Sequence, residues 1–283
     1  MESRTLVTVL RSVLALLSAF LLGVSGLLFG LVLSLIARFL LTLTLGIGLT
    51  EPQLLVLSLI TIQGIGLPAV AGAYIQFRRH LVPRICEMLE VPDRERFGIG
   101  VDVPDLRDLG VSVLGYGTAI GGLVVAAMII SAIVASTGVE TGQNQAAEVG
   151  MENPEVLLLL IPASFLLIGP GEELLFRGIV QGRIRERFGP ISGIVTASVF
   201  FAGIHYFALT GGSASGNLVA LGGLVIPSLV LGTAYEYTDN IVVPSLIHGA
   251  YNATLFSLLY VVVRYSDQLE AAGAATLAPA VGL

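Results

Sequence analysis

The chain has 283 residues, of which 55% carry hydrophobic side chains and only 12% are charged, and its mean hydropathy is +0.91. Soluble domains usually have about 25% charged residues, so this composition excludes a water-soluble globular protein. The basic residues are 14 arginines, and the 20 acidic residues leave a net charge of −6, which argues against a nucleic-acid-binding protein. The chain is therefore expected to be an integral membrane protein, with the lipid bilayer as a partner and no nucleic acid.

Seven apolar stretches have about the length needed to cross a hydrocarbon core of about 30 Å, which takes roughly 20 helical residues. They are residues 12–37, 53–76, 109–136, 156–182, 190–209, 218–235 and 241–263. The first is too long for a secretory signal peptide, so it is interpreted as a span, and the apolar run up to Thr50 leaves room for an eighth, re-entrant piece. The expected fold class is an all-α, polytopic transmembrane helix bundle of seven or eight spans.

Two longer segments are expected to lie outside the bilayer. The inner loop, residues 77–108, is predicted to be interfacial and partly helical, with turns at Pro83, Pro92 and Pro104. The tail, residues 264–283, is small and apolar, and no structure is predicted for it. The chain is thus divided into an N-terminal part with spans one to three (1–136), a candidate catalytic core (156–263) and this tail.

The distribution of arginine predicts the orientation, because the cytoplasmic flanks of membrane spans collect arginine. If the N-terminus is inside, 11 of the 14 arginines lie on the inner side, while Arg38 and Arg264 lie outside. The loop from 137 to 155 has four acidic residues and no arginine, as an external loop would. We therefore expect a multi-pass protein of the cell membrane with a cytoplasmic N-terminus.

Ionisable side chains inside the predicted spans are confined to spans four, five and seven. Each charge at bilayer depth costs roughly 2.5 to 3.5 kcal/mol, so such residues normally face a cavity and mark function. With a rise of about 1.5 Å per residue, the polar groups of these three spans fall close to one layer of the bundle. These groups are Glu172, Glu173, Arg177, His205, His248 and Asn252.

The acidic pair of span four has two interpretations. Glu173 and Arg177 are four residues apart, so they are expected to pair on one helix face, whereas Glu172 is rotated by about 100° and is expected to keep its carboxylate free. The structural alternative is that the preceding Gly-Pro-Gly sequence starts a new helix, with both acids placed favourably near its positive end. The two interpretations are compatible with each other.

Spans five and seven repeat the same four-residue spacing. Phe201 lies one turn before His205, where its ring is expected to wall the environment of the imidazole, and His248 lies one turn before Asn252. A lone buried histidine is most often only hydrogen-bonded within the core. Two histidines, an asparagine and two glutamates in otherwise apolar spans favour a functional cluster instead.

A carboxylate, two imidazoles and an amide in a membrane cavity are suited to activating a water and stabilising an oxyanion, as peptide hydrolysis requires. A catalytic serine is disfavoured because no nucleophile-elbow pattern is present. A zinc site formed by Glu172, His205 and His248 is the alternative, although the three lie on separate spans and lack the HExxH spacing. The spacing alone leaves both chemistries open.

Three short motifs follow each other in the order EExxxR, FxxxH and HxxxN. They are formed by Glu172, Glu173 and Arg177 in GEELLFRG, by Phe201 and His205 in FAGIH, and by His248 and Asn252 in HGAYN. In this order the motifs resemble the type II CAAX prenyl endopeptidases and their prokaryotic relatives, the CAAX protease and bacteriocin-processing (CPBP) family of intramembrane proteases. The resemblance covers residues 171–252, and the first 150 residues add nothing to it.

The resemblance implies a role for each matching residue. Glu172 would be the general base that activates water, His205 would assist or orient it, and His248 and Asn252 would stabilise the oxyanion. Glu173 and Arg177, with Phe201, would support the site structurally. Members of this family have been described both as metalloproteases and as metal-free glutamate proteases. No cofactor is favoured here, with zinc as the alternative, because Asn252 beside His248 suits a pair of hydrogen-bond donors better than a ligand shell.

The expected function is therefore an intramembrane endopeptidase that cleaves a membrane-anchored or prenylated, CAAX-type substrate. Nothing in the sequence selects a prenyl chain over a transmembrane peptide. Two other classes remain as alternatives: a proton-coupled transporter, since buried Glu and His also form proton relays, and a catalytically silent membrane scaffold. The hydrolase hypothesis requires Glu172 to face the interior of the bundle, close to an imidazole.

Overall fold

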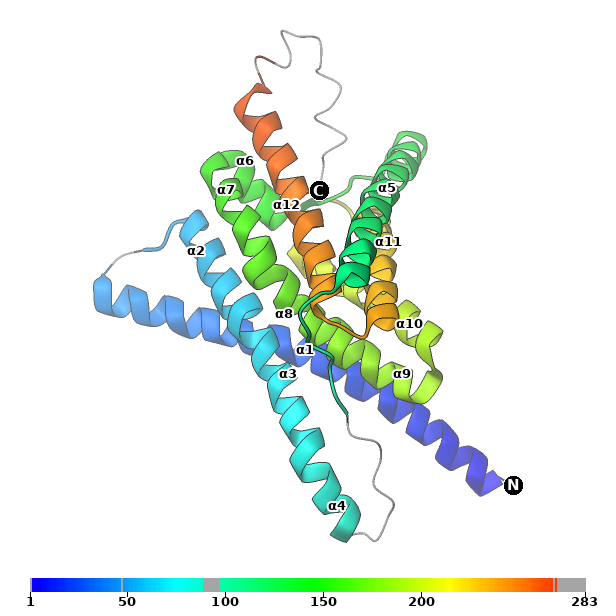
Figure 1. Ribbon diagram of the computed structural model, residues 1–283. Helices are drawn as coiled ribbons and strands as arrows, with labels where there is room; N and C mark the ends of the chain where they lie inside the picture. The colour runs from blue at the N-terminus through cyan, green and yellow to red at the C-terminus, as the bar shows by residue number, and fades with distance from the viewer. Residues whose placement is uncertain (1, 47, 89–96, 267, 269–283) are drawn as a thin grey trace.

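The computed structural model describes residues 2–46, 48–88, 97–266 and 268. In these ranges the chain forms a bundle of long helices with a single pair of two-residue strands (Figure 1). Seven helices in the described part are long and apolar enough to cross a membrane: Leu6–Thr44, Glu51–Met88, Leu106–Thr137, Pro154–Phe188, Pro190–Ala208, Ala214–Thr238 and Val242–Arg264. The predicted fold class, an all-α polytopic bundle, is confirmed, and the protein is a multi-pass membrane protein.

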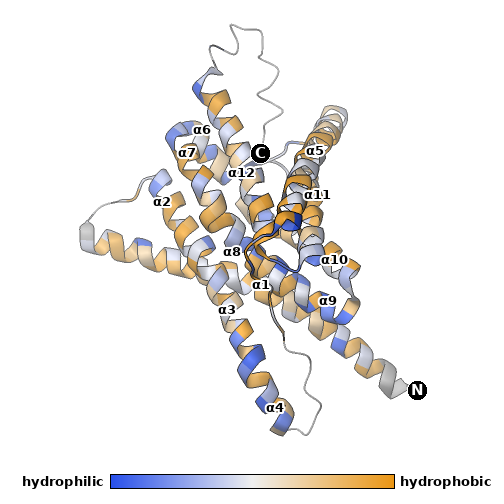
Figure 2. Cartoon of the chain, viewed as in Figure 1, coloured by the Kyte–Doolittle hydropathy of each residue, from blue (hydrophilic) through white to orange (hydrophobic). Residues whose placement is uncertain are grey.

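The first span is one continuous helix, α1 (Glu2–Leu45), which crosses behind the other helices in Figure 1. The described part of the apolar run therefore holds no separate re-entrant piece. Most of the large apolar side chains of α1 are exposed, as expected for a surface that faces lipid. Figure 2 shows the same property for the bundle: hydrophobic residues cover most of the long helices, whereas hydrophilic ones lie mainly near the helix ends, among them α4, α6 and α9.

The second span is longer than predicted. It runs without a break through α2 (Glu51–Ser58), η1 (Leu59–Gly66), α3 (Leu67–Gln76), η2 (Phe77–Leu81) and α4 (Val82–Met88), where η1 and η2 are π-helical. The predicted inner loop is therefore helical as far as Met88, and the turn predicted at Pro83 is wrong. Pro92 lies outside the described residues, and Pro104 lies in an irregular segment just before α5 (Leu106–Thr137).

Proline is accommodated in these helices by π-helical segments. A proline interrupts the i to i−4 ladder because it lacks an N–H and its ring presses on a preceding carbonyl. The π segments η1, η2 and η3 (Ser164–Ile168) each end two residues before a proline, namely Pro68, Pro83 and Pro170. The wider π turn leaves room for the ring, so the helix continues where the sequence predicts a break.

The fourth span is the centre of the bundle (Figure 1). It consists of α7 (Pro154–Ala163), η3, α8 (Gly169–Glu173), the π-helical η4 (Leu174–Gln181) and α9 (Gly182–Phe188). The α-helical segment α8 begins at the Gly-Pro-Gly sequence, as the structural alternative expects, but it continues directly from η3 within one unbroken span. A main core cluster of the bundle includes Leu175, Phe176, Ile179 and Val180 of η4, which are almost completely buried. These buried side chains anchor the helix directly after the acidic pair.

The segments between spans three and six carry the strand pair. After α5, β1 (Gln143–Asn144) and α6 (Gln145–Glu152) precede the fourth span, and β1 pairs antiparallel with β2 (Leu209–Thr210). The fifth span differs from the prediction because its α-helix, α10 (Pro190–Ile204), gives way to the 3₁₀ turn η5 (His205–Ala208). The strand pair therefore ties the chain just after His205 to the loop between α5 and α6.

The last two spans complete the bundle. They are α11 (Ala214–Thr238) and α12 (Val242–Arg264), and α12 packs against α7, η3 and α8. The second of them ends close to the boundary predicted from the sequence. Most of the predicted tail lies outside the described residues, so the bundle described here ends with α12.

Candidate active site

The acidic pair lies where three helices approach each other closely. A Cβ atom at Gly169 would lie 2.8 Å from the carbonyl oxygen of Ser245 on α12, and one at Gly171 would overlap the backbone of Gln63 on η1. The two glycines therefore let α8 pack against η1 and α12 at backbone distance. Glu172 and Glu173 follow directly and are both buried, at 6% and 0% exposed. Neither carboxylate faces lipid.

Glu173 forms the ion pair that the sequence predicts. Its Oε2 accepts a hydrogen bond from Nε of Arg177 at 2.9 Å, and both side chains are fully buried. The guanidinium also donates from Nη2 to Oγ of Ser228 on α11 at 3.0 Å and lies 5.0 Å from the ring centre of Phe201 on α10. Arg177 thus links the fourth span to both neighbouring helices, and breaking a buried pair of this kind leaves an uncompensated charge.

His248 lies between the two glutamates. Its Nδ1 donates to Oε1 of Glu173 at 2.9 Å, and its Nε2 lies 3.8 Å from Oε2 of Glu172. Glu173 therefore uses both oxygens, one for Arg177 and one for His248, which goes beyond the expected local pair. A carboxylate at Nδ1 fixes the orientation of the imidazole and leaves Nε2 directed toward Glu172.

One of the two carboxylate oxygens of Glu172 is hydrogen-bonded, whereas the sequence predicts that the carboxylate is free. Its Oε1 accepts a hydrogen bond from Nε2 of Gln63 at 2.7 Å. Its Oε2 is buried and has no hydrogen-bond partner among the described residues. A buried carboxylate oxygen without a protein partner is costly unless it serves a function or binds water. It lies beside Nε2 of His248, which places an acceptor next to an imidazole in the membrane interior.

Phe201 connects the two histidines. Its ring centre lies 4.5 Å from that of His205 and 5.9 Å from that of His248, so the aromatic wall expected beside His205 is confirmed. Nδ1 of His205 donates to the backbone carbonyl of Phe201 at 2.7 Å, since a carbonyl only accepts. The other ring nitrogen, Nε2, has no hydrogen-bond partner in the described ranges. His205 is half-buried and begins η5, one residue beyond α10.

Asn252 lies one turn beyond His248 on α12 and is half-buried. Within the described ranges its amide has no hydrogen-bond partner, so its donors remain available to a substrate. The structure thus gathers six of the seven motif residues into one bonded or stacked cluster, with Asn252 on the same helix as His248. The six are Glu172, Glu173, Arg177, Phe201, His205 and His248.

The alternative zinc set does not fit this geometry. In the described part of the chain, no group of three or more His, Cys, Asp or Glu side chains is placed to hold a metal ion. Structural and catalytic zinc sites need at least three protein ligands at about 2.0 to 2.3 Å. Glu172, His205 and His248 do not form such a group in this arrangement of the described residues.

Two residues that contact the cluster, Gln63 and Ser228, are not predicted from the sequence. Gln63 has one available signal, since it is a polar amide in the middle of the stretch predicted as the second span (53–76), but that stretch carries no charge or histidine to draw attention to it. Ser228 has no signal, because serine is common in membrane helices and its contact with Arg177 joins residues 51 positions apart. Only the packing of separate spans reveals both.

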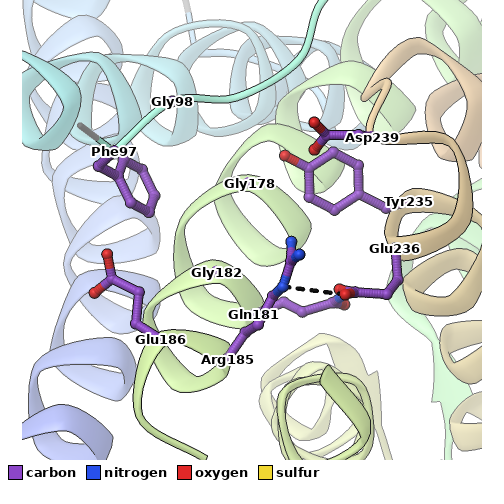
Figure 3. Close-up of a pocket in the computed structure, with 10 residues that line it drawn as sticks. All are labelled: Phe97, Gly98, Gly178, Gln181, Gly182, Arg185, Glu186, Tyr235, Glu236 and Asp239. Atoms are coloured by element: carbon purple, nitrogen blue, oxygen red, sulfur yellow. Dashed lines mark ion pairs between the residues drawn. The ribbon is translucent and has the colours of Figure 1, made fainter. Parts of the chain in front are cut away.

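A polar pocket of about 460 Å³ lies farther along the same helix, at its arginine-rich end (Figure 3). Its lining residues are Phe97, Gly98, Gly178, Gln181, Gly182, Arg185, Glu186, Tyr235, Glu236 and Asp239. Across it, Nε of Arg185 pairs with Oε1 of Glu236 at 3.0 Å, as the dashed line in Figure 3 marks. None of the motif residues lines this pocket, so it is distinct from the buried cluster.

Comparison with known proteins adds to this geometry. Residues 154–254 match the family model described as Type II CAAX prenyl endopeptidase Rce1-like, and this range contains all seven motif residues. The chain is also 36% identical over 83 residues to the uncharacterized protein YpbD of Bacillus subtilis (strain 168). That stretch is 29% of this chain and 36% of YpbD, so the chain spans about a third of the relative's length. No solved structure matches the chain significantly.

Proposed function

We propose that the chain is an intramembrane endopeptidase, because residues 154–254 match the family model described as Type II CAAX prenyl endopeptidase Rce1-like. The observation that carries the proposal is the buried, unpartnered Oε2 of Glu172, 3.8 Å from Nε2 of His248. This pair places a proton acceptor beside an imidazole inside the membrane, where ionisable side chains are costly and normally mark function.

In the proposed reaction, Glu172 accepts a proton from a water molecule through Oε2 as the water oxygen attacks the scissile carbonyl carbon. Nε2 of His205, which is left free by the bond from Nδ1 to the backbone, orients this water. When the tetrahedral intermediate breaks down, the proton held by Glu172 passes to the leaving amine. The carboxylate is thereby regenerated, and the peptide bond is replaced by a carboxyl group and an amine.

The oxyanion of the intermediate needs hydrogen-bond donors. We assign this role to the amide of Asn252 and to Nε2 of His248. Because Nδ1 of His248 donates to Oε1 of Glu173 at 2.9 Å, Nε2 can donate as well only when the ring is doubly protonated, and the carboxylate of Glu173 stabilises that form. Glu173 and Arg177 thus support the site in two ways, by joining helices and by orienting His248.

The substrate that suits this site is a peptide anchored in the membrane, and the family description points to a protein prenylated near its C-terminus. The orientation remains the one predicted from arginine, with a cytoplasmic N-terminus in the cell membrane. The arginine-rich segments η2 and α9 then face the cytoplasm, and a substrate anchored in the cytoplasmic leaflet approaches from that side.

The test replaces Glu172 with glutamine. We expect Glu172→Gln to lower turnover at least a hundredfold, since an amide does not accept the proton of water. The readout is hydrolysis of a peptide ending in a farnesylated cysteine and three further residues, by the purified protein in liposomes, together with proteomic comparison of membrane-protein C-termini in cells with either allele.

Glu155→Gln is the matched control, because Glu155 is exposed at the start of the same span. It should leave both readouts unchanged. Full activity of Glu172→Gln would contradict the proposed function. It would also be contradicted if the wild-type protein left the peptide uncleaved and the C-termini of membrane proteins were the same in cells with either allele.

A further inference from the structure

The second span contributes to the proposed active site although it lies outside the residues matched by the family model. We infer that Gln63 is a positioning residue, which holds the carboxylate of Glu172 so that Oε2 is presented to water beside His248. This inference rests on the proposed function and deepens it. It assigns a part of the active site to the first 150 residues of the chain, which carry none of the three motifs.

The contact between the two residues is short and enclosed. Nε2 of Gln63 donates to Oε1 of Glu172 at 2.7 Å, across 109 residues of sequence. The backbone of Gln63 also fills the space next to Gly171, where any Cβ would overlap its carbonyl oxygen. The π-helical segment η1, which carries Gln63, is therefore fixed against α8 by backbone packing as well as by the side chain. Such π-helical segments are frequent at functional sites.

The two adjacent carboxylates are bonded in different ways, and the difference matches their proposed roles. Glu173 has both oxygens bonded to groups that carry or accept positive charge, Arg177 and His248. Glu172 has one oxygen bonded to a neutral amide, and the other lies 3.8 Å from Nε2 of His248 without a hydrogen-bond partner among the described residues. A neutral donor at Oε1 fixes the rotation of the carboxylate without adding a second positive charge that would lower its basicity. Glutamine thus suits a partner of a general base.

The remaining atom of the amide supports the same assignment. Oε1 of Gln63 is buried and has no hydrogen-bond partner among the described residues. An unmet buried acceptor destabilises the fold unless water or a substrate meets it. Oε2 of Glu172 is also buried and lacks a hydrogen-bond partner in the described ranges, so the two side chains joined by this hydrogen bond each have one acceptor left for a water molecule.

The experiment removes the hydrogen-bond donor of Gln63 and keeps a side chain of similar volume. In Gln63→Met we expect kcat for the farnesylated peptide to fall about tenfold to a hundredfold, the range for a hydrogen bond to a charged group, with KM within twofold of wild type. Gln76→Met is the matched control, since Gln76 is an exposed glutamine of the same span and should leave kcat unchanged. In a Glu172→Gln background, Gln63→Met should add no further loss to the residual rate.

A spectroscopic measurement tests the contact independently of any substrate. The difference in infrared absorption between wild type and Glu172→Gln isolates the carboxylate band of Glu172. Gln63→Met should shift this band, and Gln76→Met should leave it in place. An unshifted band, or equal losses of activity in the wild-type and Glu172→Gln backgrounds, would overturn the inference.

The outcomes separate the inference from the proposed function. An active Glu172→Gln protein contradicts the function itself, whereas an inactive Glu172→Gln protein with a fully active Gln63→Met protein contradicts only the role of Gln63. If Gln63→Met does not fold, Gln63→Glu decides, because it keeps the length and polarity but places a second carboxylate against Glu172. A kcat within twofold of wild type for Gln63→Glu would then overturn the inference.

Discussion

At the scale of single residues, two chemically identical side chains have different hydrogen-bond partners. Glu172 and Glu173 are neighbours in the sequence, yet one has a free oxygen beside His248 and the other is fully bonded. The helix separates the two side chains by about 100°, so each meets a different set of spans. The neighbouring helices, more than the residue type, determine which carboxylate is free to act as a base.

The amide of Asn252 provides a test of the oxyanion assignment. Removing an oxyanion donor typically costs about 2.7 to 4 kcal/mol, so Asn252→Ala should slow turnover roughly a hundredfold or more. Because Asn252 has no hydrogen-bond partner in the described part of the protein, the melting temperature should hardly change. Hydrolysis of the farnesylated peptide and thermal unfolding in detergent measure the two effects. Equal activity of Asn252→Ala and wild type would remove Asn252 from the mechanism.

Metal dependence is tested by chelation. We expect that exhaustive treatment with a chelator leaves turnover unchanged, since the proposed reaction uses only Glu172 and the imidazole and amide groups around it. The measurement compares activity before treatment, after treatment and after addition of zinc. Inhibition that zinc reverses would replace the metal-free mechanism with one in which Glu172, His205 and His248 rearrange into a ligand shell.

At the scale of elements, the position of His205 depends on a contact outside the helices. The α-helical geometry of α10 ends at Ile204, and η5 leads directly into β2, which pairs with β1. Gly211 and Gly212 follow β2 with φ angles of 66° and 68°, which favour glycine. The two-residue strand pair and this turn therefore fix the segment that carries His205.

The two glycines offer a matched pair of substitutions. Gly211→Ala strains the backbone in otherwise open space, whereas a Cβ at Gly212 would overlap the backbone N of Gly142 in the loop before β1. Strain of this kind costs about 1 to 3 kcal/mol at either site. We expect Gly212→Ala to lower kcat more than Gly211→Ala, because only it displaces the segment next to His205. Equal kcat values in the two variants would contradict this coupling.

At the scale of the whole molecule, the bundle separates its charges along the membrane normal. Arginines gather in η2 and α9, and α4 and α9 carry hydrophilic colour in Figure 2 toward the end of the bundle where the polar pocket is found. The four acidic residues between 137 and 155 lie in or beside α6, at the other end of the fourth span. This asymmetry predicts a single orientation in the bilayer.

Labelling of cysteine tests this orientation. Cys86, the single cysteine of the chain, lies half-buried in α4, and a membrane-impermeant maleimide should label it only after the cells are permeabilised. The matched variant Cys86→Ser with Ser136→Cys moves the thiol to the exposed end of α5 and should be labelled in intact cells. The reverse pattern would place the N-terminus outside.

The sequence by itself determined the membrane bundle and most of its polar centre. Apolar runs of about 20 residues predict spans because lipid offers no hydrogen bonds to an open backbone, and the cost of buried charge singles out Glu172, Glu173, Arg177 and the histidines. The four-residue spacing predicts the pair of Glu173 with Arg177 and the stacking of Phe201 on His205, since both are local to one helix turn.

The tertiary structure alone decided the contacts between spans. The bond from Gln63 to Glu172 and the bond from His248 to Glu173 join residues 109 and 75 positions apart. The continuation of the helices through Pro83 and Pro170 depends on π turns, which local sequence rules do not anticipate. Periodicity fixes which face of a helix a residue occupies, but only packing fixes which neighbour that face meets, and here the neighbour decides which carboxylate is left free for chemistry.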